Sequence, residues 1–190
     1  MPRIPLITPE TLTDEQRPVY NKIVSGPRGK IQGPLRAALH NPELADAWQA
    51  LGALLRYRTS LPPRLSELAI LVTAVARQSP FEWYAHRIEG EKAGIEPAIF
   101  AALLAGEEPP GMSGDDRLVY RFALELNRLN SVRDDTYAAA LERFGARTLV
   151  ELTALVGYYT MVALTLNAHE VPLPPGAEPA FELPQRRGGA

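Results

Sequence analysis

Two acidic residues and one histidine have spacings that could support proton-transfer chemistry. Glu67 is the one charged residue of the apolar run 65–76, and a carboxylate buried there must be paired or hydrogen-bonded, because a bare buried charge is costly. Glu82 and His86 are four residues apart, so a helix would place them in contact on one face. A carboxylate beside an imidazole orients the ring and favours its protonated form. These three residues form the candidate acid–base group.

Structural explanations compete with this chemistry. Glu67 lies early in its helix, where a carboxylate complements the helix dipole. Ser79, Pro80 and Glu82 have the spacing of a capping box, in which the serine accepts from one end amide and the glutamate accepts from the serine amide. The capping box leaves His86 unexplained, but a lone histidine on a helix is commonly a core residue. The sequence leaves both interpretations open.

Candidate substrate-binding residues flank the acid–base group. Trp83 and Tyr84 supply aromatic surface, and Ser79 supplies a hydroxyl at the start of the same helix. A carboxylated substrate would need a cation, and a guanidinium binds a carboxylate through two parallel hydrogen bonds. Arg64 is placed among the candidate substrate-binding residues, and Arg56, Arg58 and Arg87 are equally available, so the choice of arginine stays open. Arg28 and Lys30, in the glycine-rich loop 25–34, could instead close over a ligand.

Composition excludes several kinds of chemistry. The 190 residues carry a net charge of −2, which gives no general attraction to nucleic acid or to an anionic membrane. The absence of cysteine excludes disulfides, thiol nucleophiles and thiol-based peroxide reduction. With three histidines in the chain, we expect no metal and no cofactor. No export signal precedes the first helix, so the expected location is the cytoplasm.

The elements that position these residues are predicted to be helices. No stretch alternates with period two, so the predicted fold class is all-α. Clustered prolines near both ends predict extended arms at 1–12 and 170–190, around one helical domain at 13–169. Whether the arms lie across a neighbouring subunit or fray stays open. The predicted helices span 13–24, 35–40, 41–57, 62–78, 79–94, 96–106, 113–129, 134–144 and 147–167.

Two of these helices are apolar on nearly every side. The runs 65–76 and 149–166 contain one charged residue each, Glu67 and Glu151, which is typical of helices at the centre of a bundle. The uncharged stretch 152–168 contains Thr, Tyr, Gly and Asn, so we interpret it as a buried core helix rather than a membrane span. Segments 65–72 and 149–156 agree at five of eight positions, and a duplication of two similar helical halves stays open.

Several segments together resemble a known family. The runs Arg64–Val72, Phe81–His86 and Lys92–Gly94 resemble the carboxymuconolactone decarboxylase family, within the alkylhydroperoxidase-D-like (AhpD-like) superfold. Four later segments are similar to the same family: 135–137, 143–145, 157–159 and 167–174. The resemblance as a whole covers most of the chain, from about 34 to 174. The resemblance implies an AhpD-like helical bundle, self-association into a homo-oligomer and a small-molecule substrate or ligand.

The resemblance also assigns positions to the catalytic residues of the peroxidase branch. There a relay glutamate precedes a Cys-x-x-Cys pair, and a histidine follows the second cysteine by four residues. On this chain the glutamate falls on Glu67, the histidine on His86, and the two cysteine positions on Ser79 and Glu82. A serine hydroxyl cannot pass through sulfenate chemistry. The chain therefore resembles a branch without the thiol pair, which argues against a peroxidase of that kind.

The remaining chemistry is proton transfer. The resemblance implies a lyase or isomerase without cofactor, in which His86 donates or accepts a proton, Glu82 orients it, and Glu67 supports it or acts as the alternate acid. One alternative is a thiol-free descendant of the peroxidase fold that binds a small apolar ligand without converting it. Another is a purely structural oligomer. The catalytic interpretation requires His86 to line a cavity inside the bundle.

Overall fold

The computed structural model describes residues 2–26 and 29–181, and all regular structure in that part of the chain is helical. The all-α prediction is therefore confirmed. The first helix begins later than expected, because Thr13 and Gln16 bond to one another in a turn before it. After a 3-10 turn at Pro9–Thr11, the helices are α1 (Arg17–Ser25), α2 (Pro34–Ala38), α3 (Pro42–Tyr57), α4 (Pro63–Ala76), α5 (Pro80–Lys92), α6 (Pro97–Ala105), α7 (Gly114–Leu129) and α8 (Asp134–His169).

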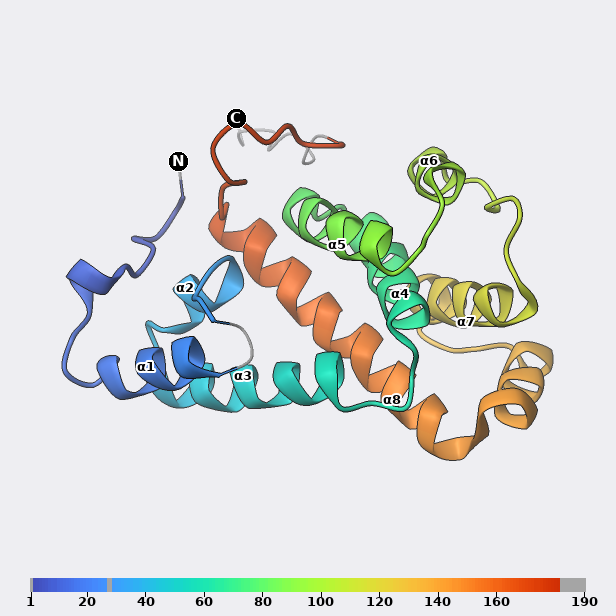
Figure 1. Ribbon diagram of the computed structural model, residues 1–190, viewed down its shortest axis with the longest axis horizontal. Coiled ribbons are helices and arrows are strands. Elements are labelled where there is room, and N and C mark those ends of the chain that lie inside the picture. The colour runs from blue at the N-terminus through green and yellow to red at the C-terminus, as the bar shows by residue number, and fades with distance from the viewer. Residues whose placement is uncertain (1, 27–28, 182–190) are drawn as a thin grey trace, which may run out of the picture.

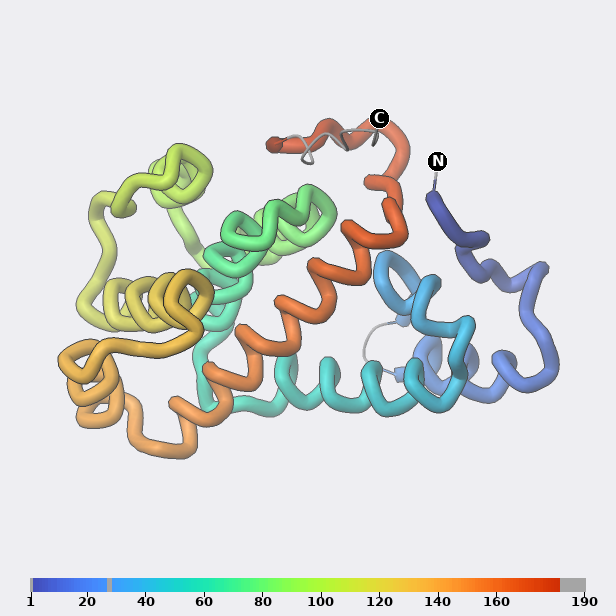
Figure 2. The backbone as a smooth tube through the Cα atoms, turned by 180° about the vertical axis from the view of Figure 1, so that it is seen from behind, coloured from blue at the N-terminus to red at the C-terminus, as the bar shows by residue number. Residues whose placement is uncertain are grey.

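Helix α8 runs diagonally through the molecule, with α1–α3 to one side and α4–α7 to the other (Figure 1). The view from behind shows the same division (Figure 2). Helix α4 packs against α5, α7 and α8, and its residues from Leu65 to Ala74 are all buried. The prediction of a central position is confirmed for α4, whereas α8 packs against the other helices with one face and leaves Val150 and Leu164 exposed.

Sequence signals at the helix ends account for most boundaries. Asn41 caps α3 by accepting a hydrogen bond from the Leu44 amide at 3.0 Å, and Pro42 occupies the first helical position, where a missing amide proton costs nothing. Ser113 and Asp116 form a reciprocal capping box at the start of α7. These local hydrogen bonds satisfy amides that would otherwise lack a partner at the helix end.

The expected interruption between 134–144 and 147–167 lies within α8. Gly145 has φ 78° and ψ 163° and kinks the helix there. Within the described residues, α8 is the one helix long and apolar enough to cross a membrane, but half of its most apolar stretch is buried inside the fold. Helices α3, α4, α5 and α7 pack against it. This burial supports the interpretation of α8 as a core helix.

The N-terminal arm packs on its own chain. The His40 Nε2 atom lies 2.7 Å from the Pro5 carbonyl oxygen, and the Arg36 side chain donates to the Ile7 carbonyl at 3.0 Å. The Arg3 amide donates to the His169 carbonyl at 2.9 Å, which joins this arm to the end of α8. Beyond α8, residues 171–181 have no regular structure. Arg28 and the end of the C-terminal arm, 182–190, lie outside the described residues.

Candidate active site

A histidine between two carboxylates forms the candidate site. His86 on α5 places its Nδ1 atom 2.6 Å from Oε2 of Glu67 on α4. Its other ring nitrogen, Nε2, lies 3.4 Å from Oε2 of Glu82, one turn earlier on α5. All three side chains are largely enclosed, with exposed fractions of 6% for His86, 12% for Glu67 and 5% for Glu82. The structure thus brings the three predicted acid–base residues together.

The packing of α4 on α5 creates this arrangement. Glu67 is buried on a helix whose neighbouring side chains are apolar, so its carboxylate has few alternative partners. The interval of four residues carries Glu82 to the ring on the same helix, as the sequence predicts. The structure therefore favours the interpretation in which the Glu67 carboxylate pairs with His86 over the one in which it only complements the dipole of α4.

The two carboxylates determine the protonation state of His86. Burial lowers the pKa of the imidazole, but the charge of Glu67 and its hydrogen bond, together with Glu82, outweigh burial and raise that pKa from 6.5 to about 9. The ring is therefore an imidazolium near neutral pH. Since an imidazolium can only donate protons, His86 is poised to act as an acid in this state.

The predicted capping box at the start of α5 is wrong. Ser79 makes no side-chain capping hydrogen bond, and among the described residues its fully buried Oγ has no hydrogen-bond partner. The Glu82 carboxylate contacts His86 instead of returning to the Ser79 amide. Oε2 of Glu82 also lacks a well-formed hydrogen bond within the described chain. The first turn of α5 thus carries a buried serine hydroxyl without a described hydrogen-bond partner.

Sequence reasoning did not assign Tyr159 to the site. Its ring lies edge-on to the His86 ring, with centroids 4.8 Å apart and planes at 87°. Burial raises the pKa of the Tyr159 phenol well above 10, although the positive charge of Arg56 acts against this. The phenol therefore stays protonated near neutral pH. The sequence feature that could have pointed to Tyr159 is its position in the apolar run 149–166.

The remaining predicted binding residues lie in different surroundings. Trp83 is 2% exposed and packs edge-on against Phe100, as a core residue does. Tyr84 is half-buried. Arg64 donates to the Gly94 carbonyl and pairs with Asp116 and Glu96, so its guanidinium is already occupied. Among the predicted binding side chains, Ser79 has a fully buried polar atom without a hydrogen-bond partner in the described part of the chain.

His86 is almost fully enclosed, at 5% exposed, where the sequence prediction requires it to line a cavity. None of the five cavities that we describe in residues 2–26 and 29–181 is lined by Glu67, Glu82 or His86. The Tyr159 ring covers the imidazole instead. A cavity of about 470 Å³ lies over the first turn of α5, at Pro80 and Phe81. A substrate could thus reach His86 in this protein only after side chains move.

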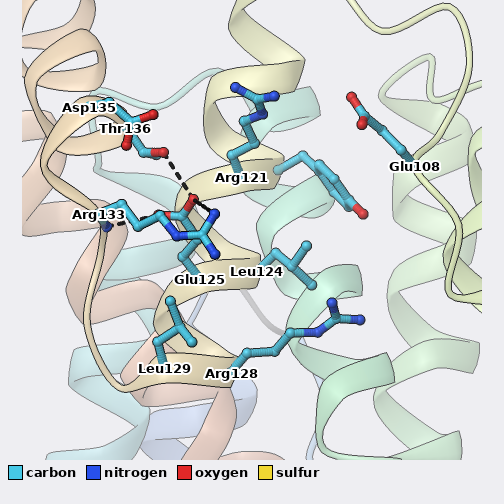
Figure 3. A pocket seen from close by; sticks show the side chains of 10 residues that line it. Glu108, Arg121, Leu124, Glu125, Arg128, Leu129, Arg133, Asp135 and Thr136 are labelled. Atoms are coloured by element: carbon cyan, nitrogen blue, oxygen red, sulfur yellow. Dashed lines mark hydrogen bonds and ion pairs between the residues drawn. The ribbon is translucent and has the colours of Figure 1, made fainter.

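A polar cavity of about 300 Å³ lies elsewhere, along α7 and the start of α8 (Figure 3). Glu125 is used there to close the turn between the helices, since it accepts hydrogen bonds from the Thr136 hydroxyl and the Arg133 amide. The charged lining is balanced, with three arginines and three acidic residues: Arg121, Arg128, Arg133, Glu108, Glu125 and Asp135. This cavity is separate from the acid–base group.

In the part of the chain that the structure describes, no group of three or more His, Asp and Glu side chains is arranged to hold a metal ion. His86 forms a hydrogen-bonded ion pair with Glu67 and a longer ion pair with Glu82.

Comparison with known proteins places this geometry in a family context. Residues 42–124 match the model of the carboxymuconolactone decarboxylase family, and this span contains Glu67, Ser79, Glu82 and His86. The resemblance predicted from the sequence is therefore confirmed over that span. No curated protein matches the chain in sequence.

Solved structures extend the likeness to nearly the whole chain. The AhpD core structure of an uncharacterized peroxidase-related protein from Ralstonia eutropha JMP134 is similar with a TM-score of 0.75 and 16% identity, covering 92% of this chain and 93% of that one. A peroxidase-related protein from Silicibacter sp. TM1040 gives 0.73 and 16%, covering 90% and 91%. The debrominase Bmp8 gives 0.69 and 13%, with the same coverage. The AhpD-like fold is thus confirmed.

Proposed function

From the premise that this chain carries the carboxymuconolactone decarboxylase family pattern on an AhpD-like fold, we propose that it is an acid–base lyase or isomerase. Its substrate would be a small carboxylated or lactone compound. The observation that supports this proposal is the His86 imidazolium held between Glu67 and Glu82 in a nearly water-free setting. The chemistry needs no redox step, which is consistent with the absence of thiols from the sequence.

The proposed step is decarboxylation of a carboxylated lactone. The bond between ring carbon and carboxylate breaks, carbon dioxide leaves, and the electron pair is delocalised into the conjugated lactone carbonyl. The Nε2–H of His86 then protonates the resulting carbanion, and water returns a proton to the ring. Glu67 holds Nδ1 and so keeps Nε2 as the donating atom, while Glu82 orients the Nε2 side of the ring.

The structure narrows the choice of the cation for a substrate carboxylate. Arg64 is occupied by three partners, and Arg87 pairs with Glu91 at 2.8 Å. Arg56 forms no ion pair with a described acidic residue, and it lies close enough to Glu67 and Tyr159 to interact electrostatically with both. We therefore propose that Arg56 binds the substrate carboxylate. Arg56 lies at the Glu67 end of the site, and Glu67 is the most exposed of the three acid–base side chains.

A product-detecting screen of the purified protein tests this function. Small lactones and unsaturated carboxylic acids are incubated with the wild type, His86→Asn, and the matched pair Arg56→Met and Arg58→Met. We expect His86→Asn to lower kcat at least 100-fold, as loss of a positioned acid does, and Arg56→Met to raise KM while Arg58→Met does not. Unchanged turnover of an active substrate by His86→Asn would remove His86 from the mechanism.

A second candidate function follows from the enclosure of the imidazole. A protein that binds a small apolar ligand without converting it needs no access to His86, and the apolar cavity at Pro80 and Phe81 lies outside the acid–base group. Equilibrium dialysis followed by mass spectrometry distinguishes the two functions. Ligand recovered unaltered after long incubation supports binding alone, whereas a new product supports the lyase.

Self-association is a further part of the proposal. An apolar stripe follows the outer face of α8 at intervals of four and three residues, through Val150, Ala154, Gly157, Met161 and Leu164, all of them exposed. Val150 is 69% and Leu164 57% exposed, and this spacing suits packing against another helix. We propose that a second copy covers the stripe. Leu164→Glu should then yield monomers in size-exclusion chromatography with light scattering, while Leu104→Glu on α6 should leave the mass unchanged.

A further inference from the structure

A large apolar cavity lies between the two arms, separate from the acid–base group. Its volume is about 840 Å³, within the 300–1,000 Å³ typical of ligand pockets. The N-terminal arm forms one wall, Gly29–Gly33 a second, and Val171–Pro175 a third, with Phe81 between them. The arm prolines and the glycine-rich loop, which the proposed enzyme function leaves without a role, thus enclose one space.

Hydrogen bonds hold the walls of this cavity in place. Arg36 of α2 donates to the Ile7 carbonyl at 3.0 Å, and His40, just after α2, contacts the Pro5 carbonyl at 2.7 Å, so the arm is attached at two points. Ile7 is 6% exposed and belongs to the core. The Arg3 amide bonds to the His169 carbonyl, where the second arm begins. The space is therefore a defined feature of the fold.

The contact between Gly33 and Phe81 sets one side of the cavity. Gly33 has φ 55°, and a Cβ atom there would lie 2.8 Å from the Phe81 ring. Real Cβ atoms do not approach so closely, so any larger residue would push the ring aside. Since Phe81 lines the cavity, the size of residue 33 controls the shape available to a ligand.

The polar groups of the cavity indicate the charge of the ligand. Within the described chain, Lys30 has neither an ion pair nor a hydrogen bond, and Arg36 is used on backbone carbonyls. Glu10 contributes a negative charge to the opposite wall, which disfavours a head group with several charges. The rest of the lining is mainly apolar: Val24, Ile31, Phe81, Val171, Leu173 and several prolines.

We propose that this cavity binds an amphipathic monocarboxylate of the medium-chain fatty acid type. The carboxylate lies at Lys30, and the hydrocarbon chain lies along Ile31, Phe81 and Leu173. Charge complementarity at Lys30 selects the head group, and the apolar walls stabilise the tail through removal of its surface from water. The site acts independently of His86.

Calorimetric titration of the full chain with dodecanoate and with dodecanol, both below their aggregation concentrations, tests the proposal. We expect saturable 1:1 binding of dodecanoate. Lys30→Met should weaken it about two- to fivefold, the effect of losing an exposed charge pair, and leave dodecanol binding unchanged. Lys92→Met, which removes a lysine paired with Glu89 on α5, is the matched control and should bind as the wild type does.

Two glycine variants test whether dodecanoate binds in this cavity. Gly33→Ala should lose most dodecanoate binding, whereas Gly111→Ala, with a similar φ of 69° and open space around it, should retain it. His86→Asn should bind normally. Equal affinity of Lys30→Met and wild type, full binding by Gly33→Ala, or loss of binding in His86→Asn would each overturn the proposal. Because the readout is binding, it does not depend on whether any substrate is converted.

Discussion

Raising the pH should weaken the fold through His86. The native pKa of His86 is about 9 against 6.5 for a free imidazole. Below pH 6.5 the ring is protonated in both the folded and the unfolded chain, so the stabilisation by Glu67 and Glu82 is complete. Between pH 6.5 and about 9 the unfolded chain has lost the proton that the native state keeps, so the free energy of unfolding falls. Above that range the contribution is gone.

The magnitude follows from the difference between the two pKa values. A shift of one pKa unit corresponds to 1.36 kcal/mol, so a shift from 6.5 to about 9 gives about 3 kcal/mol. With a side chain 6% exposed, His86 is little screened by solvent. A loss of this size is a large fraction of the stability of an ordinary domain, and it should be measurable without extreme conditions.

Urea unfolding followed by circular dichroism at intervals from pH 6 to pH 10 is the suitable measurement. Glu67→Gln removes the charge that holds the proton on His86, so we expect the variant to be less stable than wild type at pH 6 by about 3 kcal/mol and to show a much flatter pH profile. Glu91→Gln removes an exposed carboxylate of α5, the helix that carries His86, where it pairs with Arg87, and this variant should keep the wild-type slope.

Two results would refute this reasoning. One is a wild-type profile that shows no more loss of stability between pH 6.5 and 9 than the Glu67→Gln profile does. The other is an NMR titration in which the His86 ring loses its proton near pH 6.5 in the folded protein. Either would mean that burial outweighs the two carboxylates and that His86 is neutral at working pH.

Further variants test other parts of the structure. Arg64→Met should destabilise the fold by about 3 kcal/mol, because it leaves the buried Asp116 carboxylate unpaired, whereas the exposed Arg87→Met should change stability by about 0.5 kcal/mol or less in urea unfolding. Ser79→Ala removes a buried hydroxyl without a described partner, so its melting temperature should equal or exceed that of wild type; a clear drop would show an unrecognised hydrogen bond. Gly145→Ala should cost about 1–2 kcal/mol in chemical unfolding, because alanine is strained at φ 78°.

Local sequence patterns were sufficient to predict much of the fold. The prolines and caps at Asn41 and Ser113 predict where helices begin because those signals act within one turn of the chain. The uniform apolarity of α4 predicts its central position, since this helix has no polar face to turn toward water. Gly145 predicts the break in α8 for the same local reason, its tolerance of positive φ.

Local patterns misled at the start of α5, where two partners compete for one carboxylate. The spacing of Ser79 and Glu82 fits a capping box, but Glu82 contacts His86 instead. Nothing in the sequence gives the relative strength of the two contacts. Packing decides it, because a buried imidazolium gains more from a second carboxylate than an amide does from a cap.

The sequence by itself determined the helical fold class, the boundaries of most helices, the position of Glu82 and His86 on one helical face and the exclusion of thiol chemistry. These properties depend on residue type and short-range spacing. The tertiary structure decided that Glu67 reaches Nδ1 of His86, that Tyr159 covers the ring, that Arg64 is occupied while Arg56 is not, and that the arms enclose a cavity. Each of these depends on contacts between helices or arms distant in sequence, which only the packing of the whole chain determines.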